Sequence, residues 1–228
     1  MSIMSTMRVA TVFSIVSLCA LAPSAYGSSS LSFSSNVFNK TINQGDEIYI
    51  HTLSGRSYGA CTLGYVTNDY ALTAGHCGFE NYIVKNNNGK KIGHIDYIDY
   101  NGAQDIAIIK LDDDVISGSN TYSGDYITSM AEMSPSDKLC HYGKTTKQVI
   151  CAEQYRLPTY GLFWSKGTGK PGDSGGPVWV EGKGLIGIIS TKGNGYTTST
   201  EAWITINKYP EFTAPRASST TGFIPLDN

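Results

Sequence analysis

Short apolar runs separated by turn-forming residues recur along the chain from Ile42 onward, and this pattern limits the fold most strongly. Typical runs are EIYIHTL, CTLGYV, DIAIIKL, GPVWV and LIGIIST, with glycine, asparagine, aspartate and lysine between them. No stretch with helical periodicity interrupts them before the C-terminal end. Many short strands at this spacing indicate an all-β sandwich or barrel fold, and 228 residues suffice for one large β domain or two small ones.

The composition agrees with a β protein and argues against two classes of partner. Charged residues make up 16% of the chain, against roughly 25% in ordinary soluble domains, while 25 glycines and 15 tyrosines favour turns and strands. The net charge is −2. This balance gives no electrostatic reason to expect binding to nucleic acid or to an anionic membrane.

The N-terminus has the pattern of a secretory signal. Arg8 precedes the apolar run Val9–Ala22, and small residues follow up to Gly27. The run is too short for a membrane span, so we expect a signal peptide over residues 1–27 and a secreted, extracellular protein. We interpret the serine-rich stretch 28–41 as a short pro-segment or flexible lead.

Four cysteines remain outside the predicted signal, and an even number in an exported chain indicates two disulfides. Three pairings are open. We favour Cys61–Cys77 and Cys140–Cys151, because each closes a short local loop. The chain lacks the CxxC spacing of a zinc site, so we expect no metal and no cofactor.

The stretch GKPGDSGGPVW surrounds Ser174 with glycines, more than a simple turn needs. Such a backbone can aim two N–H groups, those of Gly172 and Ser174, at one oxygen. Paired amides of this kind stabilise an oxyanion, and the serine hydroxyl needs a neighbouring base to act as a nucleophile.

His76, in ALTAGHCG, and Asp105, in NGAQDIAIIKL, are the candidate base and its partner. A cysteine beside His76 could fix its backbone, although an isolated histidine could also merely cap a strand. Asp105 begins an apolar strand, where a charge needs hydrogen bonds, such as one from an imidazole. The acidic run 112–114 could bind calcium, but a solvated turn explains it better.

Three motifs, in this order, resemble the chymotrypsin-type serine peptidases: TAGHC (73–77), DIAIIKL (105–111) and GDSGGP (172–177). Within that family the chain is most similar to the bacterial streptogrisin branch. The stretches that carry the closer similarity, which extends over about residues 42–210, are INQGDEIYI (42–50), ACTLGYV (60–66), CHYGKTTKQVIC (140–151) and KPGDSGGP (170–177).

The resemblance implies two six-stranded antiparallel Greek-key β-barrels with the active site in the cleft between them. We expect the first barrel over residues 42–125, the second over 126–215 and an unassigned tail over 216–228. The implied site roles are His76 as general base, Asp105 as its orienting acid, Ser174 as nucleophile, and the N–H groups of Gly172 and Ser174 as oxyanion hole.

The resemblance also places the substrate-binding residues. Ser190, Thr191 and Lys192 would pair with the substrate as an added strand. Thr168 and Glu201 would lie at the floor of the specificity pocket. A carboxylate at Glu201 could bind a lysine or arginine side chain, unless it points to solvent or is neutralised by Lys192.

Three features depart from the family pattern. Lys170 and the cysteine-free KGNGYTT occupy the places where relatives have a third disulfide. His141 occupies the place of an arginine that pairs with the aspartate before the nucleophile, so Asp173 is expected to be held by His141 or by a free amine at Ile42 after processing. The long folding pro-region common in that branch is also missing.

These observations predict a secreted serine endopeptidase with basic or large apolar residues preferred before the cleaved bond. A catalytically inactive relative that binds partners through the same cleft is the alternative, and an esterase-like or very narrow peptidase is a third interpretation. We expect polypeptide substrates and protein protease inhibitors as partners, no nucleic acid or membrane, and a monomer.

Overall fold

The structure is a computed structural model that describes residues 40–101, 104–159, 162–166, 169–193 and 196–201. The predicted signal peptide (1–27) and C-terminal tail (216–228) lie outside the described residues, as does almost all of the serine-rich lead. Two short 3-10 helices, η1 (Gly75–Cys77) and η2 (Met130–Glu132), are the only helices in the described ranges, and the rest of the regular structure is β-strand. The all-β fold class is therefore confirmed.

The first sheet is antiparallel and has the order β3-β2-β6-β7-β8-β5-β4. Its strands are β2 (Glu47–His51), β3 (Ser57–Thr62), β4 (Tyr65–Val66), β5 (Tyr70–Thr73), β6 (Ile83–Asn86), β7 (Lys91–Tyr100) and β8 (Asp105–Leu111). It has seven strands instead of the expected six because one segment, residues 57–66, is interrupted at Leu63 and Gly64. The first part of this segment pairs with β2 and the second with β5, so the sheet curls until both of its edges are made by the same stretch of chain.

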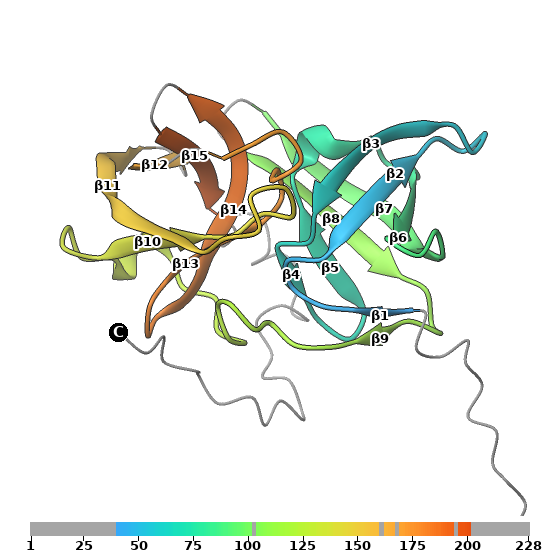
Figure 1. Cartoon of the computed structure of the whole chain (residues 1–228), viewed down its shortest axis with the longest axis horizontal. Coiled ribbons are helices and arrows are strands. Elements are labelled where there is room, and N and C mark those ends of the chain that lie inside the picture. The colour runs from blue at the N-terminus through green and yellow to red at the C-terminus, as the bar shows by residue number, and fades with distance from the viewer. Residues whose placement is uncertain (1–39, 102–103, 160–161, 167–168, 194–195, 202–228) are drawn as a thin grey trace, which may run out of the picture. The chain divides into compact units, whose positions relative to one another are not determined.

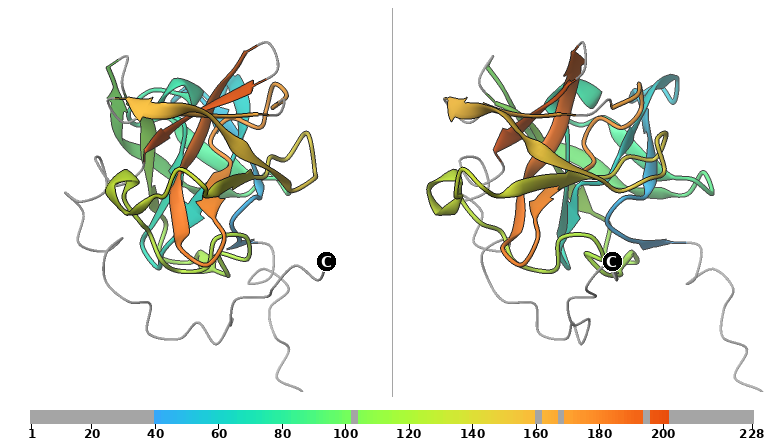
Figure 2. Two further views of the ribbon diagram at one scale, coloured as in Figure 1. Left: turned by 90° about the vertical axis from the view of Figure 1, so that its left-hand side faces the viewer. Right: turned by 60° about the vertical axis from the view of Figure 1, so that its left-hand side comes forward.

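The second sheet is a closed antiparallel barrel of six strands in the order β10-β11-β12-β15-β14-β13. Its strands are β10 (Lys138–His141), β11 (Ile150–Thr159), β12 (Leu162–Lys166), β13 (Pro177–Val180), β14 (Gly184–Gly193) and β15 (Tyr196–Glu201). Figure 1 and the turned views in Figure 2 show these strands as one group, coloured from yellow-green to red. A short parallel pair, β1 (Thr41–Ile42) with β9 (Ile116–Ser117), completes the described strands.

Both sheets have the same Greek-key connectivity. In the barrel, β10, β11 and β12 are consecutive neighbours and β13 returns beside β10. If β3 and β4 are counted as one strand, the first sheet repeats this order, with β6 returning beside β2. The strands of the two sheets fall within the predicted ranges 42–125 and 126–215, whose boundaries stay predictions.

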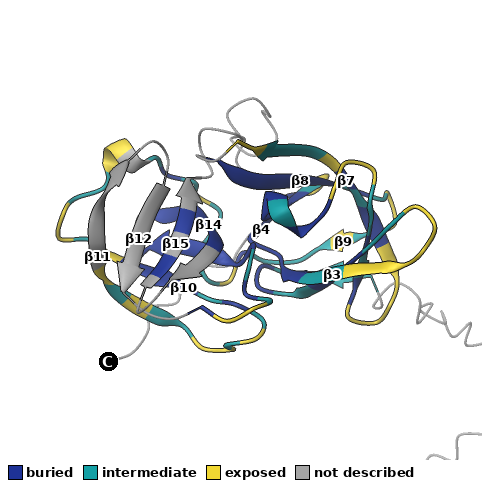
Figure 3. Ribbon diagram, turned by 90° about the horizontal axis from the view of Figure 1, so that it is seen from above, coloured by how far each residue is buried: buried dark blue, intermediate teal, exposed yellow. Residues whose placement is uncertain are grey.

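The hydrophobic core follows from the strand patterns. In β2 the side chains alternate between buried and half-buried, as expected for a strand with one face in the core. All of β8 except Lys110 is buried, and Figure 3 shows this strand in dark blue. Leu185 and Ile188 of β14 belong to the same apolar cluster as the core of the first sheet, so the two sheets are packed together by burial of apolar surface.

We predict that truncating a central β8 side chain destabilises the whole fold. Ile108 has 0% exposure, so Ile108→Ala should lower the free energy of unfolding by about 2–5 kcal/mol in urea titrations. Leu53 is 72% exposed, and Leu53→Ala is the matched control, with less than about 0.5 kcal/mol expected. Equal losses in both variants would contradict this assignment of the core.

Candidate active site

The three residues singled out by the sequence motifs come from both halves of the fold. His76 lies in η1, directly after β5, and Asp105 is the first residue of β8. Ser174 lies in the turn-rich segment between β12 and β13. Strand β5 pairs with β8, with Thr73 opposite Ala107, and this pairing brings the end of β5 close to the start of β8.

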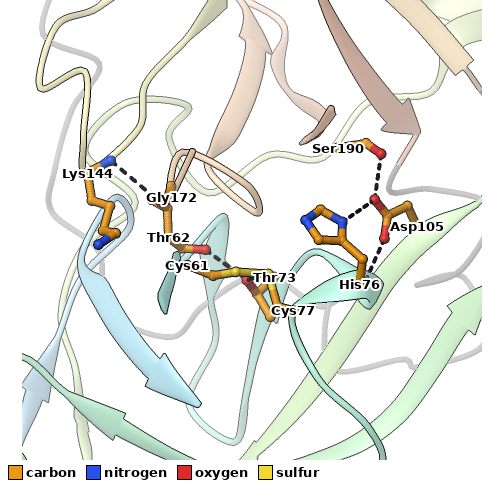
Figure 4. Close-up of a disulfide and its surroundings, with 9 residues drawn as sticks. All are labelled: Cys61, Thr62, Thr73, His76, Cys77, Asp105, Lys144, Gly172 and Ser190. Carbon is orange, nitrogen blue, oxygen red and sulfur yellow. Dashed lines mark hydrogen bonds and ion pairs between the residues drawn. A yellow bond between two sulfur atoms is a disulfide. The ribbon is translucent and has the colours of Figure 1, made fainter. Parts of the chain in front are cut away.

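Asp105 and His76 form two hydrogen bonds. The His76 Nδ1 atom lies 2.7 Å from Oδ2 of Asp105, and the His76 backbone N–H donates to Oδ1 over 2.8 Å. The double contact fixes both the backbone and the ring of His76 (Figure 4). Gly75 permits this approach, because a Cβ atom there would lie 3.1 Å from Asp105 Oδ1.

A third hydrogen bond to this carboxylate comes from the second sheet. Ser190 of β14 donates its hydroxyl to Asp105 Oδ2, as Figure 4 shows. The sequence predicts Ser190 only as a substrate-pairing residue, so this contact is an additional one. Burial raises the pKa of Asp105, but the hydrogen bond and charge of His76 and the Ser190 hydroxyl outweigh it, and the pKa lies below its ordinary value.

His76 and Ser174 line the same pocket. The other residues around it are Gly169, Lys170, Pro171, Ile189 and Ser190. The Nε2 atom of His76 has no hydrogen-bond partner within the described part of the chain, and neither has the Ser174 hydroxyl. Because the contact between a base and its nucleophile is often formed only when substrate is bound, this arrangement can support proton transfer from Ser174 to His76.

The backbone next to Ser174 carries two unused hydrogen-bond donors. The N–H groups of Gly172 and Ser174 have no acceptor among the residues that the structure describes. Gly172 has a φ of +98°, and a Cβ atom there would lie 2.5 Å from the Thr145 hydroxyl oxygen. Glycine is therefore required at 172 both by its backbone angle and by the space available.

The expected hydrogen bond from His141 to Asp173 is not present, and other groups hold this carboxylate. Its Oδ1 atom accepts the backbone N–H groups of Thr145 and Thr146, each over 2.9 Å, and its Oδ2 atom accepts the Lys170 N–H over 2.7 Å. The Thr146 hydroxyl also donates to Oδ2. Neutral donors thus satisfy the carboxylate in the unprocessed chain, and a free amine at Ile42 after processing stays a prediction.

His141 is buried in β10, and neither of its ring nitrogens has a hydrogen-bond partner among the described residues. Burial lowers the pKa of His141, although the charge of nearby Asp173 acts in the opposite direction. A neutral ring suits this apolar position better than a charged one. The charge of Asp173 therefore acts on His141, but the two side chains form no hydrogen bond.

Both favoured disulfides are present in the structure. Cys61 of β3 is bonded to Cys77 of η1, and Cys140 of β10 is bonded to Cys151 of β11. The first bond joins η1 to β3, and its Cys77 directly follows His76 in the sequence. In Figure 4 it lies between the His76–Asp105 pair and the residues Thr62 and Gly172. It therefore supports the histidine from the side of the first sheet.

The remaining predicted pocket residues are not tested at the level of side chains. Thr168 lies outside the described residues. Thr191 and Lys192 belong to β14. Glu201 is the last residue of β15 and lies opposite Gly187 of β14. Their roles in substrate binding stay predictions.

The acidic run after β8 forms surface ion pairs. Asp112 lies 3.0 Å from the ammonium of Lys91, and Asp114 lies 2.6 Å from that of Lys40. Over the described ranges, no group of three or more histidine, cysteine, aspartate or glutamate side chains could hold a metal ion. In the same part of the chain, no helix is long and apolar enough to cross a membrane.

Two Greek-key sheets with a histidine, an aspartate and a serine brought together between them are typical of chymotrypsin-like serine proteases. Residues 37–161 match the Trypsin family, and the chain belongs to that family. An uncharacterized protein of Mycobacterium tuberculosis, Rv1815, is 30% identical over 156 residues, which cover 60% of this chain and 70% of that protein.

Solved bacterial proteases share the fold. Cellulomonas bogoriensis chymotrypsin is similar with a TM-score of 0.57 and 24% identity, over 75% of this chain and 96% of the other. A Nocardiopsis protease is similar with a TM-score of 0.56 and 21% identity, over 75% and 97% of the two chains. At these identities the likeness shows the fold alone.

We predict that Asp105 contributes to stability above acidic pH. A carboxyl whose pKa is lower in the folded protein stabilises the fold fully above its unfolded-state pKa of about 4. This contribution is lost as the pH falls through the lower folded-state value. Urea midpoints measured between about pH 6 and pH 2 should therefore depend less on pH in Asp105→Asn than in the unaltered protein. Asp113→Asn, in the exposed turn after β8, is the control and should keep the original dependence. An unchanged acid limb in Asp105→Asn would contradict the assignment.

Proposed function

We propose that the protein is a secreted serine endopeptidase that cleaves polypeptides through an acyl-enzyme on Ser174. The observation that carries this proposal is the His76–Asp105 pair, held by two hydrogen bonds, beside a pocket lined by His76 and by Ser174, whose loop also carries the unused amides of Gly172 and Ser174. Membership of the Trypsin family, whose proteases act on peptides, supports it.

In the proposed reaction, His76 Nε2 accepts the proton of the Ser174 hydroxyl as Oγ attacks the peptide carbonyl carbon. The negative charge that forms on the carbonyl oxygen is stabilised by the N–H groups of Gly172 and Ser174. The C–N bond breaks as His76 returns the proton to the leaving amine. Water, activated in the same way, then hydrolyses the ester. Asp105 keeps its proton-free form and orients the imidazole.

Two further parts of the proposal rest on sequence motifs. Membership of the streptogrisin branch is supported by the stretches around Cys61, between Cys140 and Cys151, and before Ser174. A secreted, extracellular location is supported by the predicted signal peptide and by the two disulfides, which persist in oxidising compartments.

Substrate is proposed to add a strand beside Ser190, Thr191 and Lys192 of β14, so that backbone hydrogen bonds supply much of the affinity. The side chain before the cleaved bond would enter the pocket towards Thr168 and Glu201. We propose Glu201 as the group that favours lysine and arginine there.

We predict that a fluorophosphonate probe labels the folded protein on Ser174. Because His76 activates the hydroxyl, His76→Ala should reduce the labelling rate at least about 100-fold. His94→Ala, a half-buried histidine of β7, is the control and should label normally. Peptide mapping by mass spectrometry locates the label. Folded protein that does not react would favour the alternative of an inactive binding protein.

We also predict that cleavage of a mixed peptide library occurs mainly after lysine and arginine. Loss of a charged hydrogen bond typically costs about 1.5–3 kcal/mol, so Glu201→Gln should lower kcat/KM for these sites about 10- to 100-fold. Cleavage after large apolar residues should change little. Cutting only after small residues would rule out an acidic pocket floor.

A further inference from the structure

The loop that carries Gly172 and Ser174 has four consecutive carbonyl groups, and each of them accepts a hydrogen bond of 2.9 Å. The donors are the Thr145 hydroxyl to Pro171, the Thr62 hydroxyl to Gly172, the Gly176 N–H to Asp173 and the Thr62 N–H to Ser174. Hydrogen bonds from Thr62 and Thr145 therefore fix the orientation of three of these peptide groups, and the Gly176 N–H of the same turn fixes the fourth.

Two of these carbonyl contacts, those at Pro171 and Asp173, determine where the two unused N–H groups point. In a trans peptide the C=O and N–H of one unit point in opposite directions, and the described part of the chain has no cis peptide. The Pro171 carbonyl shares its peptide group with the Gly172 N–H, and the Asp173 carbonyl shares its peptide group with the Ser174 N–H. Holding the Pro171 carbonyl at Thr145 thus turns the Gly172 N–H away from Thr145.

Two threonines supply all the side-chain donors to these carbonyls. Thr62 lies at the end of β3 with 0% exposure, and its hydroxyl oxygen also accepts the Lys144 N–H over 3.1 Å. The Lys144 ammonium forms an ion pair with Glu47 of β2. The segment 144–146 is therefore attached to the first sheet, and the loop between β12 and β13 is held between this segment and Thr62 (Figure 4).

The same segment satisfies Asp173. The Thr145 and Thr146 amides and the Thr146 hydroxyl all donate to its carboxylate. Ile42 lies instead in β1, buried, and its carbonyl accepts the Gly118 N–H over 2.7 Å. The preceding Lys40 carbonyl accepts the Ile116 N–H over 3.3 Å.

We propose that Thr145 is a positioning residue for the oxyanion-binding amide of Gly172, that Thr62 holds the loop next to this amide, and that the segment 144–146 replaces any need for a new amino terminus. Neutral donors to Asp173 assemble the site, so activity does not require cleavage before Ile42. The inference rests on the proposed peptidase function. It adds that the Gly172 amide is oriented through the Pro171 carbonyl by the hydroxyl of Thr145, which lies 26 residues before Pro171 in the sequence.

Thr145→Val tests the positioning role, because it keeps the side-chain shape and removes the hydroxyl at an exposed site. Losing an oxyanion donor costs roughly 10²–10³ in rate, and a misdirected donor should cost about 10- to 100-fold in kcat with KM changed less than about threefold. A peptide aldehyde, whose adduct with Ser174 carries an oxyanion, should bind weaker by the same factor as kcat. Thr145→Ser should restore both values.

The control is Thr121→Val, an exposed threonine whose hydroxyl is hydrogen-bonded to that of Ser119. It should keep the original kcat and aldehyde affinity. Thr62→Val removes the hydroxyl that donates to the Gly172 carbonyl. Because Thr62 is buried, this variant could fail to fold, and Thr145→Val then serves as the test on its own. Rates are expressed per active site titrated with the fluorophosphonate. A role in stability alone would lower the melting temperature and leave kcat and aldehyde affinity unchanged, and that result would overturn the proposal.

The second measurement is the amino-terminal residue of the labelled, active protein, determined by mass spectrometry. Active molecules that begin upstream of Ile42 support the inference. Activity confined to molecules that begin at Ile42 would overturn it. Failure of the unaltered protein to label would instead refute the proposed function itself, so the two failures are distinguishable.

Discussion

The buried carboxylate of Asp105 is the interaction on which the candidate site depends. A charge at the start of an apolar strand is costly unless every nearby donor is directed to it. Here the ring and backbone N–H of His76 come from the first sheet, and the hydroxyl of Ser190 comes from the second. Satisfying one charge therefore fixes the histidine and ties the two sheets together at the pocket.

Thr62 has the corresponding role on the other side of the Cys61–Cys77 disulfide. It belongs to the first sheet, but its N–H and its hydroxyl both contact the loop that carries Ser174. The two sheets repeat one connectivity, and each supplies contacts that orient residues of the other. The pocket is a product of this reciprocal arrangement, since neither sheet contains all of its residues.

Local sequence signals predicted much of this. Alternating apolar runs predicted the strands, and the close spacing of Cys61 with Cys77 and of Cys140 with Cys151 favoured the pairings that the structure contains. Asp105 was predicted to contact a histidine because a carboxylate at the start of an apolar strand needs hydrogen-bond donors, and its contact with His76 is present.

Other features could not be read from the sequence. The partners of Asp173 are mostly backbone N–H groups, which every residue type except proline offers. The two threonines that lie 28 and 27 positions before it, in KTT, give no sequence signal beyond their hydroxyl groups. His141 was predicted to hold Asp173 because it occupies the place of an arginine in the family pattern, yet its buried ring has no hydrogen-bond partner among the described residues. The interruption of one strand at Leu63 and Gly64 likewise depends on tertiary pairing with β2 and β5.

The most direct test of the whole account is a crystal structure of the protein with a peptidyl boronate. We predict a covalent bond from the Ser174 hydroxyl oxygen to boron, with one boron-bound oxygen about 2.7–3.1 Å from the N–H nitrogens of both Gly172 and Ser174. A boronate bound without that bond, or with its oxygens directed away from both amides, would contradict it.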